Sequence, residues 1–382
     1  MSNYKYIAPC LFGVEGICAF ELERMGAGNV KAENGRVNFE GDLNILARAN
    51  INSRYAERIL INVGEFEAVT FEELFQGVKA LPWENFIGKD DAFPVNGHSI
   101  NSALHSIPDC QSIIKKAIVE RLKSKYNISW FSETGVELKI RFSILKNRVS
   151  VTIDTSGEGL RKRGYRRKSN EAPLKETLAA AICDTARIFP DTKMFDPFCG
   201  SGTILIEAAM MAQKMAPGLR RFFAAEKFGF IPENVWREER AAAQDKILHN
   251  IDFRAVGYDI DPAAVRLAEE NAAKAGVSKY GMKQMLALAG QGITSFSLKP
   301  IKFIRNLGLF FFVGGFISMI VCLSLYNYIY YDYYTALIIN LIFVALGIIL
   351  IAIYIVGEYI GKIYLETKSR PKFFLERNLE EE

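Results

Sequence analysis

The sequence is poor in the residues that build disulfide or zinc frameworks. Its 382 residues include six cysteines and three histidines, and no two cysteines form a C-x-x-C pair. A structural zinc ion needs four such ligands at characteristic spacing, so we expect no metal site. We therefore interpret the cysteines as buried or incidental thiols of a reducing compartment.

The sequence also has no large excess of charge of one sign. The 47 Lys and Arg residues nearly balance the 43 Asp and Glu residues, and the formal net charge is +4. Net charge alone therefore does not indicate a nucleic-acid partner. No charged and then apolar leader precedes Tyr4, so we expect no cleaved secretory signal. The length suits two or three domains.

Strands and helices are predicted to alternate through the first 150 residues. Period-2 apolar patterns predict strands at residues 4–9, 35–41, 57–64 and 136–154. Apolar residues at helical spacing predict helices at residues 14–26, 42–50, 70–81 and 109–127. The alternation favours an α/β fold of small units.

Two basic segments are candidates for contact with phosphates. The helix expected near 109–126 carries a basic face, which is either a solvated surface or a phosphate-binding one. The loop "RKRGYRRK" can pair its arginines with phosphates and stack its tyrosine on a base, or it can be a solvated linker. Its candidate RNA-binding residues are Arg161, Lys162, Arg163, Tyr165, Arg166, Arg167 and Lys168.

A glycine-bearing turn follows the apolar strand in "TKMFDPFCGSGTILIEAAMMA". Gly200 and Gly202 allow a sharp turn and close approach of a ligand, and the helix beginning near Thr203 offers its N-terminus to a carboxylate. Asp196 closes this strand. Asp259 lies at the tip of the strand in "RAVGYDIDPAAVRLAEENA", where it can accept two ribose hydroxyls. Asp261 before Pro262 is predicted to cap a helix.

These motifs carry a resemblance to a known family. "DPFCGSGT" and "GYDIDP", with "SIPDCQSIIKKAIVERL" and "RRKSNEAPLKETLAAAI", resemble the THUMP-containing class I RNA methyltransferases that make N2-methylguanosine in large-subunit (23S) rRNA. The resemblance implies a ferredoxin-like region at residues 1–60, a THUMP RNA-binding region at 61–160 and a Rossmann-like half-domain at 161–277. It also implies a cytoplasmic protein with structured rRNA as partner.

The same resemblance implies S-adenosyl-L-methionine as the cofactor. The expected cofactor-binding residues are Asp196, Pro197, Phe198, Cys199, Gly200, Ser201, Gly202, Thr203, Asp259 and Ile260. Cys199 is interpreted as a small turn residue rather than a nucleophile, because no base stands beside it in the sequence. His98 and His105 are interpreted as ordinary surface or core residues.

The target-base motif of that family is missing. It has the form Asn-Pro-Pro-Tyr and holds the amino group in line with the methyl group, and no N-P-P occurs in this sequence. After Val277 the chain leaves no room for strands three to seven of the usual sheet. We therefore assign no catalytic residue and expect impaired catalysis.

Two uncharged apolar runs follow, at residues 307–326 and 336–357. Each can cross a hydrocarbon core of about 30 Å, and two buried core helices are the alternative. Basic residues flank the pair, and the connector "NYIYYDYYT" has neither Lys nor Arg, so both ends are expected on the cytoplasmic side of a lipid bilayer. Glu358 is expected to be an interfacial structural residue.

The last hundred residues carry a second resemblance. "SKYGMKQMLALAGQGITSFSLKPIKFIRNLG" and "VGEYIGKIYLETKSRPKF" resemble the carboxyl end of polyisoprenyl-phosphate glycosyltransferases of the dolichol-phosphate mannosyltransferase type. This implies an amphipathic juxtamembrane segment at 278–305 and an all-α hairpin of two transmembrane helices with a cytoplasmic tail at 306–382. Ser278 to Tyr280 fits both families and marks a junction.

Three hypotheses follow for the whole chain. It is an RNA methyltransferase by descent with impaired catalysis, a non-enzymatic RNA-binding module tethered to a membrane, or a chimera of two unrelated genes with no function of its own.

Overall fold

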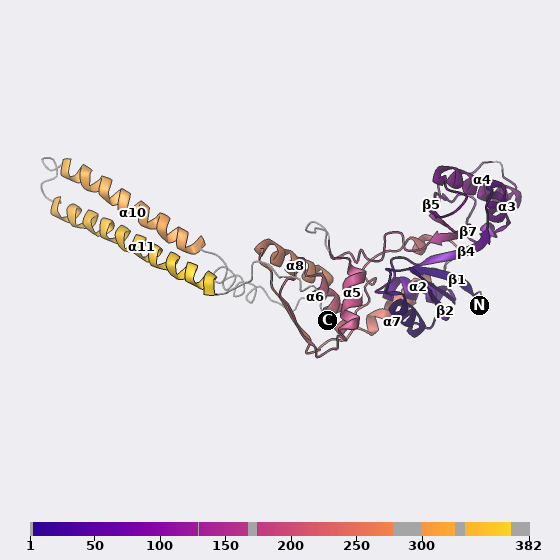
Figure 1. Ribbon diagram of the computed structural model, residues 1–382, viewed down its shortest axis with the longest axis horizontal. Helices are drawn as coiled ribbons and strands as arrows, with labels where there is room; N and C mark the ends of the chain where they lie inside the picture. Colours follow the sequence, from indigo (N-terminus) through magenta and orange to yellow (C-terminus); the bar gives the residue numbers. More distant parts are fainter. Residues whose placement is uncertain (1–2, 129, 167–173, 278–298, 325–332, 368–382) are drawn as a thin grey trace, which may run out of the picture. The chain divides into compact units, whose positions relative to one another are not determined.

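A computed structural model describes residues 3–128, 130–166, 174–277, 299–324 and 333–367. It divides into two compact units, residues 1–278 and 279–382, which are treated separately below (Figure 1). The predicted juxtamembrane segment as far as residue 298, the connector at 325–332 and the tail at 368–382 lie outside the described residues.

The first unit begins with the expected ferredoxin-like region. Its elements are β1 (Tyr4–Pro9), α1 (Glu15–Arg24), β2 (Gly28–Glu33), β3 (Arg36–Gly41) and α2 (Leu43–Asn52). The alternating apolar residues of β1 and β3, among them Tyr6 and Phe39, are buried. Asp42 starts α2 by accepting a hydrogen bond from Ile45 N at 3.0 Å.

The expected THUMP region follows. Its elements are β4 (Leu60–Glu67), α3 (Phe71–Ala80), a short 3-10 turn η1 (Trp83–Asn85), β5 (Val95–Ile100), α4 (Ile107–Tyr126), β6 (Ile140–Leu145) and β7 (Arg148–Asp154). The single long strand pattern at 136–154 is two antiparallel strands. Lys146 and Asn147 break it with positive φ angles of 51° and 67°, which make a tight hairpin turn.

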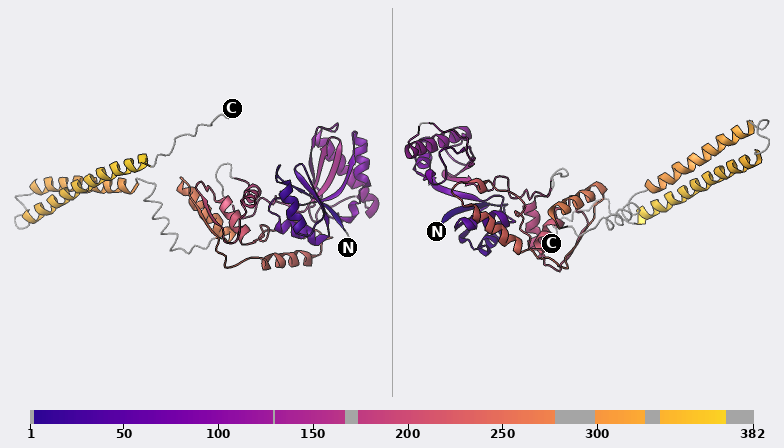
Figure 2. Two further views of the ribbon diagram at one scale, coloured as in Figure 1. Left: turned by 60° about the horizontal axis from the view of Figure 1, so that its bottom comes forward. Right: turned by 180° about the vertical axis from the view of Figure 1, so that it is seen from behind.

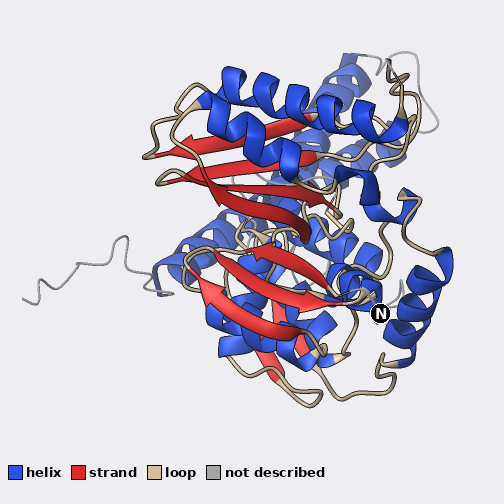
Figure 3. Ribbon diagram, turned by 90° about the vertical axis from the view of Figure 1, so that its right-hand side faces the viewer, coloured by secondary structure: helices blue, strands red, loops and turns tan. Residues whose placement is uncertain are grey.

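Among the described residues, seven strands form one sheet in the order β2-β3-β1-β4-β7-β6-β5 (Figure 3). β4 is the central strand and pairs antiparallel with β1 and with β7, for example through Leu60 opposite Asp154. The boundary expected between residues 60 and 61 falls inside β4. The ferredoxin-like and THUMP regions therefore share a sheet and one hydrophobic core.

The basic face of α4 is largely occupied by partners within the protein. Arg121 donates two hydrogen bonds to Glu84, at 2.7 and 3.0 Å, and this pairing lowers the pKa of Glu84 to about 2. Lys115 lies 2.6 Å from Glu133 and 3.7 Å from the centre of the Phe93 ring. The paired residues favour a structural surface over a phosphate-binding one.

The methyltransferase-like part of the unit follows the basic loop. Its elements are α5 (Glu176–Thr185), β8 (Lys193–Asp196), α6 (Thr203–Ala212), η2 (Ala224–Lys227), α7 (Glu233–Asp245), β9 (Arg254–Gly257) and α8 (Pro262–Ala275). β8 and β9 form a parallel two-stranded sheet, with Asp196 opposite Gly257. The two predicted strand-turn-helix units are both present.

The segment between those two units packs on the ferredoxin-like and THUMP regions. α7 lies against α2, and Glu239 of α7 pairs with Arg48 of α2 at 2.6 and 2.8 Å. Phe223 stacks on Trp236 with ring centres 5.4 Å apart, and both belong to the main hydrophobic core. The insertion therefore packs on the part of the unit that contains the seven-stranded sheet. Figure 2 shows the ribbon from two further sides.

The second unit consists, in its described part, of α10 (Lys299–Ser324) and α11 (Tyr333–Thr367). The helices lie side by side (Figure 1). Gly347 allows close approach, because a Cβ there would lie 2.5 Å from Phe312 N. Residues 302–324 and 334–360 are long and apolar enough to cross a membrane.

Candidate cofactor and RNA-binding site

The turn between β8 and α6 is built on two glycines with different roles. Gly202 has φ +78°, and a Cβ there would lie 2.8 Å from Ala268 Cβ on α8, so glycine allows α6 and α8 to pack. Gly200 has φ +53°, and a Cβ there would meet no atom of the described residues within 4 Å. Open space therefore lies above Gly200, where a ligand could approach the backbone.

The structure brings the two acidic motifs together across a separation of about sixty residues. Asp259 Oδ2 accepts a hydrogen bond from Gly200 N at 2.9 Å, and its Oδ1 accepts one from Asp261 N at 3.0 Å. Asp196 Oδ1 accepts from Phe198 N at 3.0 Å. Both carboxylates lie at the carboxyl ends of neighbouring parallel strands, where α/β sheets bind ligands.

The N-terminus of α6 faces the same turn without an acidic partner of its own. Its N-cap is Gly202, no side chain of a described residue caps it, and its first turn contains no acidic residue. A free helix N-terminus carries a partial positive charge and unpaired N–H groups, which suit a carboxylate. The residues present therefore fit the amino-acid end and the ribose of an adenosyl cofactor.

The remaining predicted cofactor residues line or support this turn. Pro197, Phe198 and Ile260 are exposed on its outer side, whereas Ser201 and Thr203 are buried beneath it, with their hydroxyls 3.2 Å apart. Burial, with Asp196 and Asp259 nearby, raises the pKa of the Cys199 thiol to about 11. Cys199 is therefore a neutral thiol at physiological pH, as expected of a turn residue.

Asp261 and the two histidines lie where the sequence predicts. Asp261 caps α8 by accepting from Ala263 N at 2.8 Å. His98 Nε2 lies 3.1 Å from Ser143 Oγ, and His105 Nδ1 lies 3.0 Å from Ala103 O, both in exposed surroundings away from the turn.

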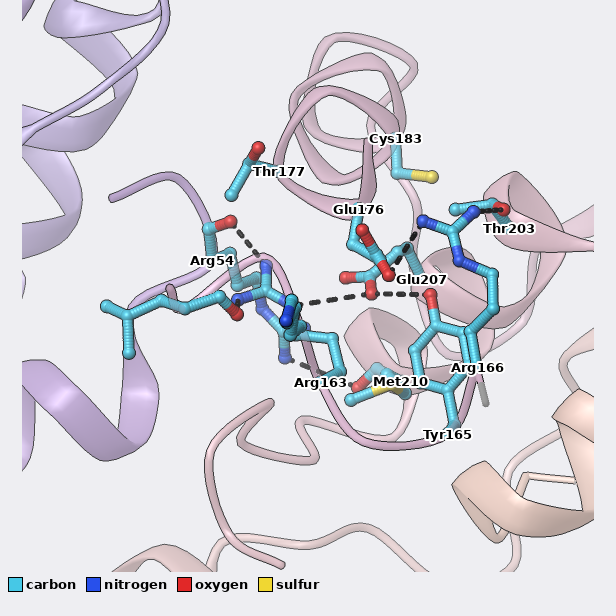
Figure 4. A network of polar contacts seen from close by, with 12 residues as sticks. Arg54, Arg163, Tyr165, Arg166, Glu176, Thr177, Cys183, Thr203, Glu207 and Met210 are labelled. Carbon is cyan, nitrogen blue, oxygen red and sulfur yellow. Dashed lines mark hydrogen bonds and ion pairs between the residues drawn. The ribbon is translucent and has the colours of Figure 1, made fainter. Parts of the chain in front are cut away.

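The basic loop differs from the expectation for three of its residues, which point into the protein (Figure 4). Arg163 is 5% exposed and Tyr165 is 4% exposed. Arg163 donates to the carbonyl oxygens of Leu160 and Arg54, at 2.8 and 2.5 Å, and Tyr165 OH donates to Glu207 Oε1 at 3.1 Å. The Tyr165 ring is therefore a core residue in this structure and not a free surface for a base.

Arg166 is also turned inward, whereas Arg161 and Lys162 are not. Arg166 pairs with Glu176 at 2.8 Å. Lys162 is exposed and lies 3.1 Å from Glu158, and Arg161 is partly exposed. Arg167 and Lys168 lie outside the described residues. The described basic side chains of the loop that face solvent are therefore Arg161 and Lys162.

Arg221, which was not among the residues predicted from the sequence, holds the main chain at the start of the loop. It donates to the carbonyl oxygens of Glu158, Gly159 and Lys162 at 2.6, 2.9 and 2.9 Å. Burial lowers the pKa of its guanidinium to about 10. The contact could not be predicted from the sequence, because Arg221 lies far from the loop along the chain. The only local hint of a role for Arg221 is its place in the basic pair of "LRRF".

Comparison with known proteins agrees with this arrangement. Profiles of the RlmL ferredoxin-like domain, the THUMP domain and the RMKL-like methyltransferase domain match residues 5–60, 68–154 and 163–288. The chain is 45% identical over 280 residues to the putative RNA methyltransferase YpsC of Bacillus subtilis, and the aligned region covers 72% of each protein. The chain belongs to the RlmL-like methyltransferase family.

Two further proteins are similar to this chain. Ribosomal RNA large subunit methyltransferase K/L of Cellvibrio japonicus is 36% identical over 70% of this chain, which spans 37% of that longer protein. The crystal structure of SMU.472, a putative methyltransferase complexed with SAH, superposes with a TM-score of 0.69 at 42% identity, covering 72% of this chain and 73% of the other.

Proposed function

We propose that residues 1–277 bind S-adenosyl-L-methionine and structured rRNA. The contact that carries the proposal is the one between Asp259 and Gly200 N, because it joins the acidic strand tip to the glycine turn. Bound there, the cofactor supplies an activated methyl group. The α6 N-terminus would hold its carboxylate, Asp259 its ribose hydroxyls, and Asp196 its cationic end.

We infer that the RNA is 23S rRNA and that the family chemistry is methylation of guanine N2. The resemblance of the motifs and the rRNA activity in the name of the C. japonicus relative support this assignment. Arg161 and Lys162 are the described loop residues that can contact phosphates, and Arg167 and Lys168 extend the basic run. The proposed domains span residues 1–60, 61–160 and 161–277, and β4 is shared between the first two.

Catalysis is proposed to be impaired, because the chain has no Asn-Pro-Pro motif to orient the amino group. Radiolabelled S-adenosyl-L-methionine should give no methyl incorporation into 23S rRNA above background. Incorporation at guanine N2 would overturn the proposed impairment.

Binding of the cofactor is tested by calorimetric titration with S-adenosylhomocysteine. We expect Asp259→Asn to weaken binding at least tenfold, because it removes the charge that accepts the ribose hydroxyls. Asp261→Asn is the matched control, since asparagine caps a helix as well as aspartate and Asp261 faces α8. Equal affinities for the two variants would contradict the assignment of Asp259.

We further propose that α10 and α11 form a two-span membrane hairpin joined to the methyltransferase part near Ser278 to Tyr280. The length and composition of the helices and the resemblance to polyisoprenyl-phosphate glycosyltransferases support it. The methyltransferase profile extends to residue 288, so the proposed junction lies within the matched range. Independent long-read sequencing across codons 270 to 290 tests whether the junction is natural.

The hairpin has its own test. After alkaline carbonate extraction of membranes, the chain should remain in the membrane pellet, and an added Asn327→Cys should react with an impermeant maleimide outside intact cells. Recovery of the chain in the carbonate supernatant would contradict the hairpin.

A further inference from the structure

A buried ionic network lies between the basic loop and α6 (Figure 4). Its centre is a pair of carboxylates, Glu207 on α6 and Glu176 on α5, which are 0% and 3% exposed. Burial raises the pKa of Glu176, and the nearby Glu207 raises it further. Two acidic groups in this position need cations beside them.

The basic loop supplies those cations. Arg163 Nε lies 3.5 Å from Glu207 Oε1, and Arg166 lies 2.8 Å from Glu176 Oε1. The second oxygen of each carboxylate, Glu207 Oε2 and Glu176 Oε2, has no hydrogen-bond partner within the described part of the chain. The pairs are therefore held by a small number of contacts, and loss of a single arginine would leave a buried charge without its partner.

Arg166 is the member of the network that touches the cofactor turn. Its Nη1 donates to Thr203 Oγ1 at 3.1 Å and to Leu174 O at 3.0 Å, while its other branch holds Glu176. Thr203 is the first residue of α6 and follows Gly202 directly. The Arg166 guanidinium thus fixes the start of α5 relative to the start of α6.

The other end of the network is the surface of the basic loop. Arg163 and Arg221 hold the main chain of residues 158–162 through its carbonyl oxygens, so Arg161 and Lys162 are presented from a fixed backbone. In the sequence, Arg166 stands between these two residues and the basic pair Arg167 and Lys168. A ligand that engages Arg161 and Lys162 acts on the backbone that continues to Arg166.

We propose that Arg166 is a positioning residue that couples RNA binding at the basic loop to cofactor binding at Gly200 and Thr203. The inference rests on the proposed function. Both ligands require the same placement of Arg166, so the first ligand to bind should raise the affinity for the second. By thermodynamic linkage, RNA must raise the affinity for the cofactor by the same factor by which the cofactor raises the affinity for RNA. Such coupling factors are typically about 5-fold to 150-fold.

The experiment titrates S-adenosylhomocysteine into the full chain in detergent, with and without saturating purified 23S rRNA. For the unaltered chain we expect the Kd to fall about 5-fold or more when RNA is present. The variant Arg166→Met/Glu176→Gln removes both charges of the pair, so neither residue is left as a buried charge without its partner. This variant should bind both ligands, with the same Kd for S-adenosylhomocysteine whether or not RNA is present. Arg166→Lys keeps the positive charge but loses the two-branched guanidinium that contacts Thr203 and Glu176, so RNA should lower its Kd only slightly.

Arg36→Gln is the matched control, because Arg36 pairs with Glu33 in the ferredoxin-like region. In this variant RNA should lower the Kd for S-adenosylhomocysteine as much as in the unaltered chain. Equal Kd values with and without RNA in the unaltered chain, when RNA is shown to bind, would overturn the coupling alone. Full coupling in the Arg166→Met/Glu176→Gln variant would overturn the role of Arg166. Failure of both ligands to bind would instead overturn the proposed function.

Discussion

The two glycines of the β8–α6 turn give the sharpest prediction about the site. Gly202→Ala introduces a Cβ 2.8 Å from Ala268 Cβ at a residue with φ +78°, so strain and crowding act together. A non-glycine residue in the left-handed region costs roughly 1–2 kcal/mol, and overpacking typically costs about 1–3 kcal/mol more. We therefore expect Gly202→Ala to destabilise the first unit by about 2–5 kcal/mol.

Gly200→Ala should behave differently, because its φ is +53° and, in the described part of the chain, nothing lies within 4 Å of the new Cβ. The left-handed backbone alone costs roughly 1–2 kcal/mol, so most of the fold's stability should be kept. The new methyl group enters the open space above the turn, however, and should weaken binding of S-adenosylhomocysteine at least tenfold.

The assay compares thermal unfolding of the two variants with that of the unaltered chain and then titrates the folded proteins with S-adenosylhomocysteine. The reasoning is refuted if Gly202→Ala is no less stable than Gly200→Ala. It is also refuted if Gly200→Ala binds the ligand with unchanged affinity, since the open space would then not belong to the cofactor site.

Other predictions concern stability and pH. Burial raises the pKa of Glu21 to about 7, above that of the unfolded chain, so its ionisation opposes folding and stability falls as pH rises from about 4.5 through 7. The free energy of unfolding of Glu21→Gln should therefore rise, relative to that of the unaltered chain, by up to about 3 kcal/mol between pH 4 and pH 8. A stability difference between the two proteins that did not change with pH would contradict this. Glu239→Ala should cost about 1–3 kcal/mol by denaturant unfolding, since it removes the bidentate partner of Arg48, and the Arg48→Ala/Glu239→Ala double variant should show non-additivity. Cys199→Ser should bind S-adenosylhomocysteine with nearly unchanged affinity, because the Cys199 thiol is neutral and buried in the turn.

Much of the fold follows from local patterns in the sequence. Strands with a buried apolar face, such as β1 and β3, and helices with caps, such as α3 with its Thr70 and Glu73 capping box, were predictable. β2 and β5 were missed because they are the two edge strands of the sheet. An edge strand with both faces partly exposed has no strong apolar alternation to detect, and β2 is exposed at five of its six residues.

The site was predictable where glycine and capping chemistry are local, and not where partners are distant. The glycine turn, Asp259 and Asp261 depend on short motifs. The direction of Arg163 and Arg166 depends instead on Glu207 and Glu176, which a reading of the loop alone does not connect to them. A basic run has the same composition whether its guanidinium groups face phosphates or buried carboxylates. The docking of α7 on α2 is likewise a tertiary contact without a local signal.

The central claim is that the glycine turn and Asp259, at the ends of β8 and β9, form a working cofactor site. Calorimetric titration of the full chain with S-adenosylhomocysteine tests it most directly. The account predicts saturable binding of one molecule per chain at micromolar concentration, weakened at least tenfold by Asp259→Asn. Absence of binding to a chain shown to be folded would contradict it.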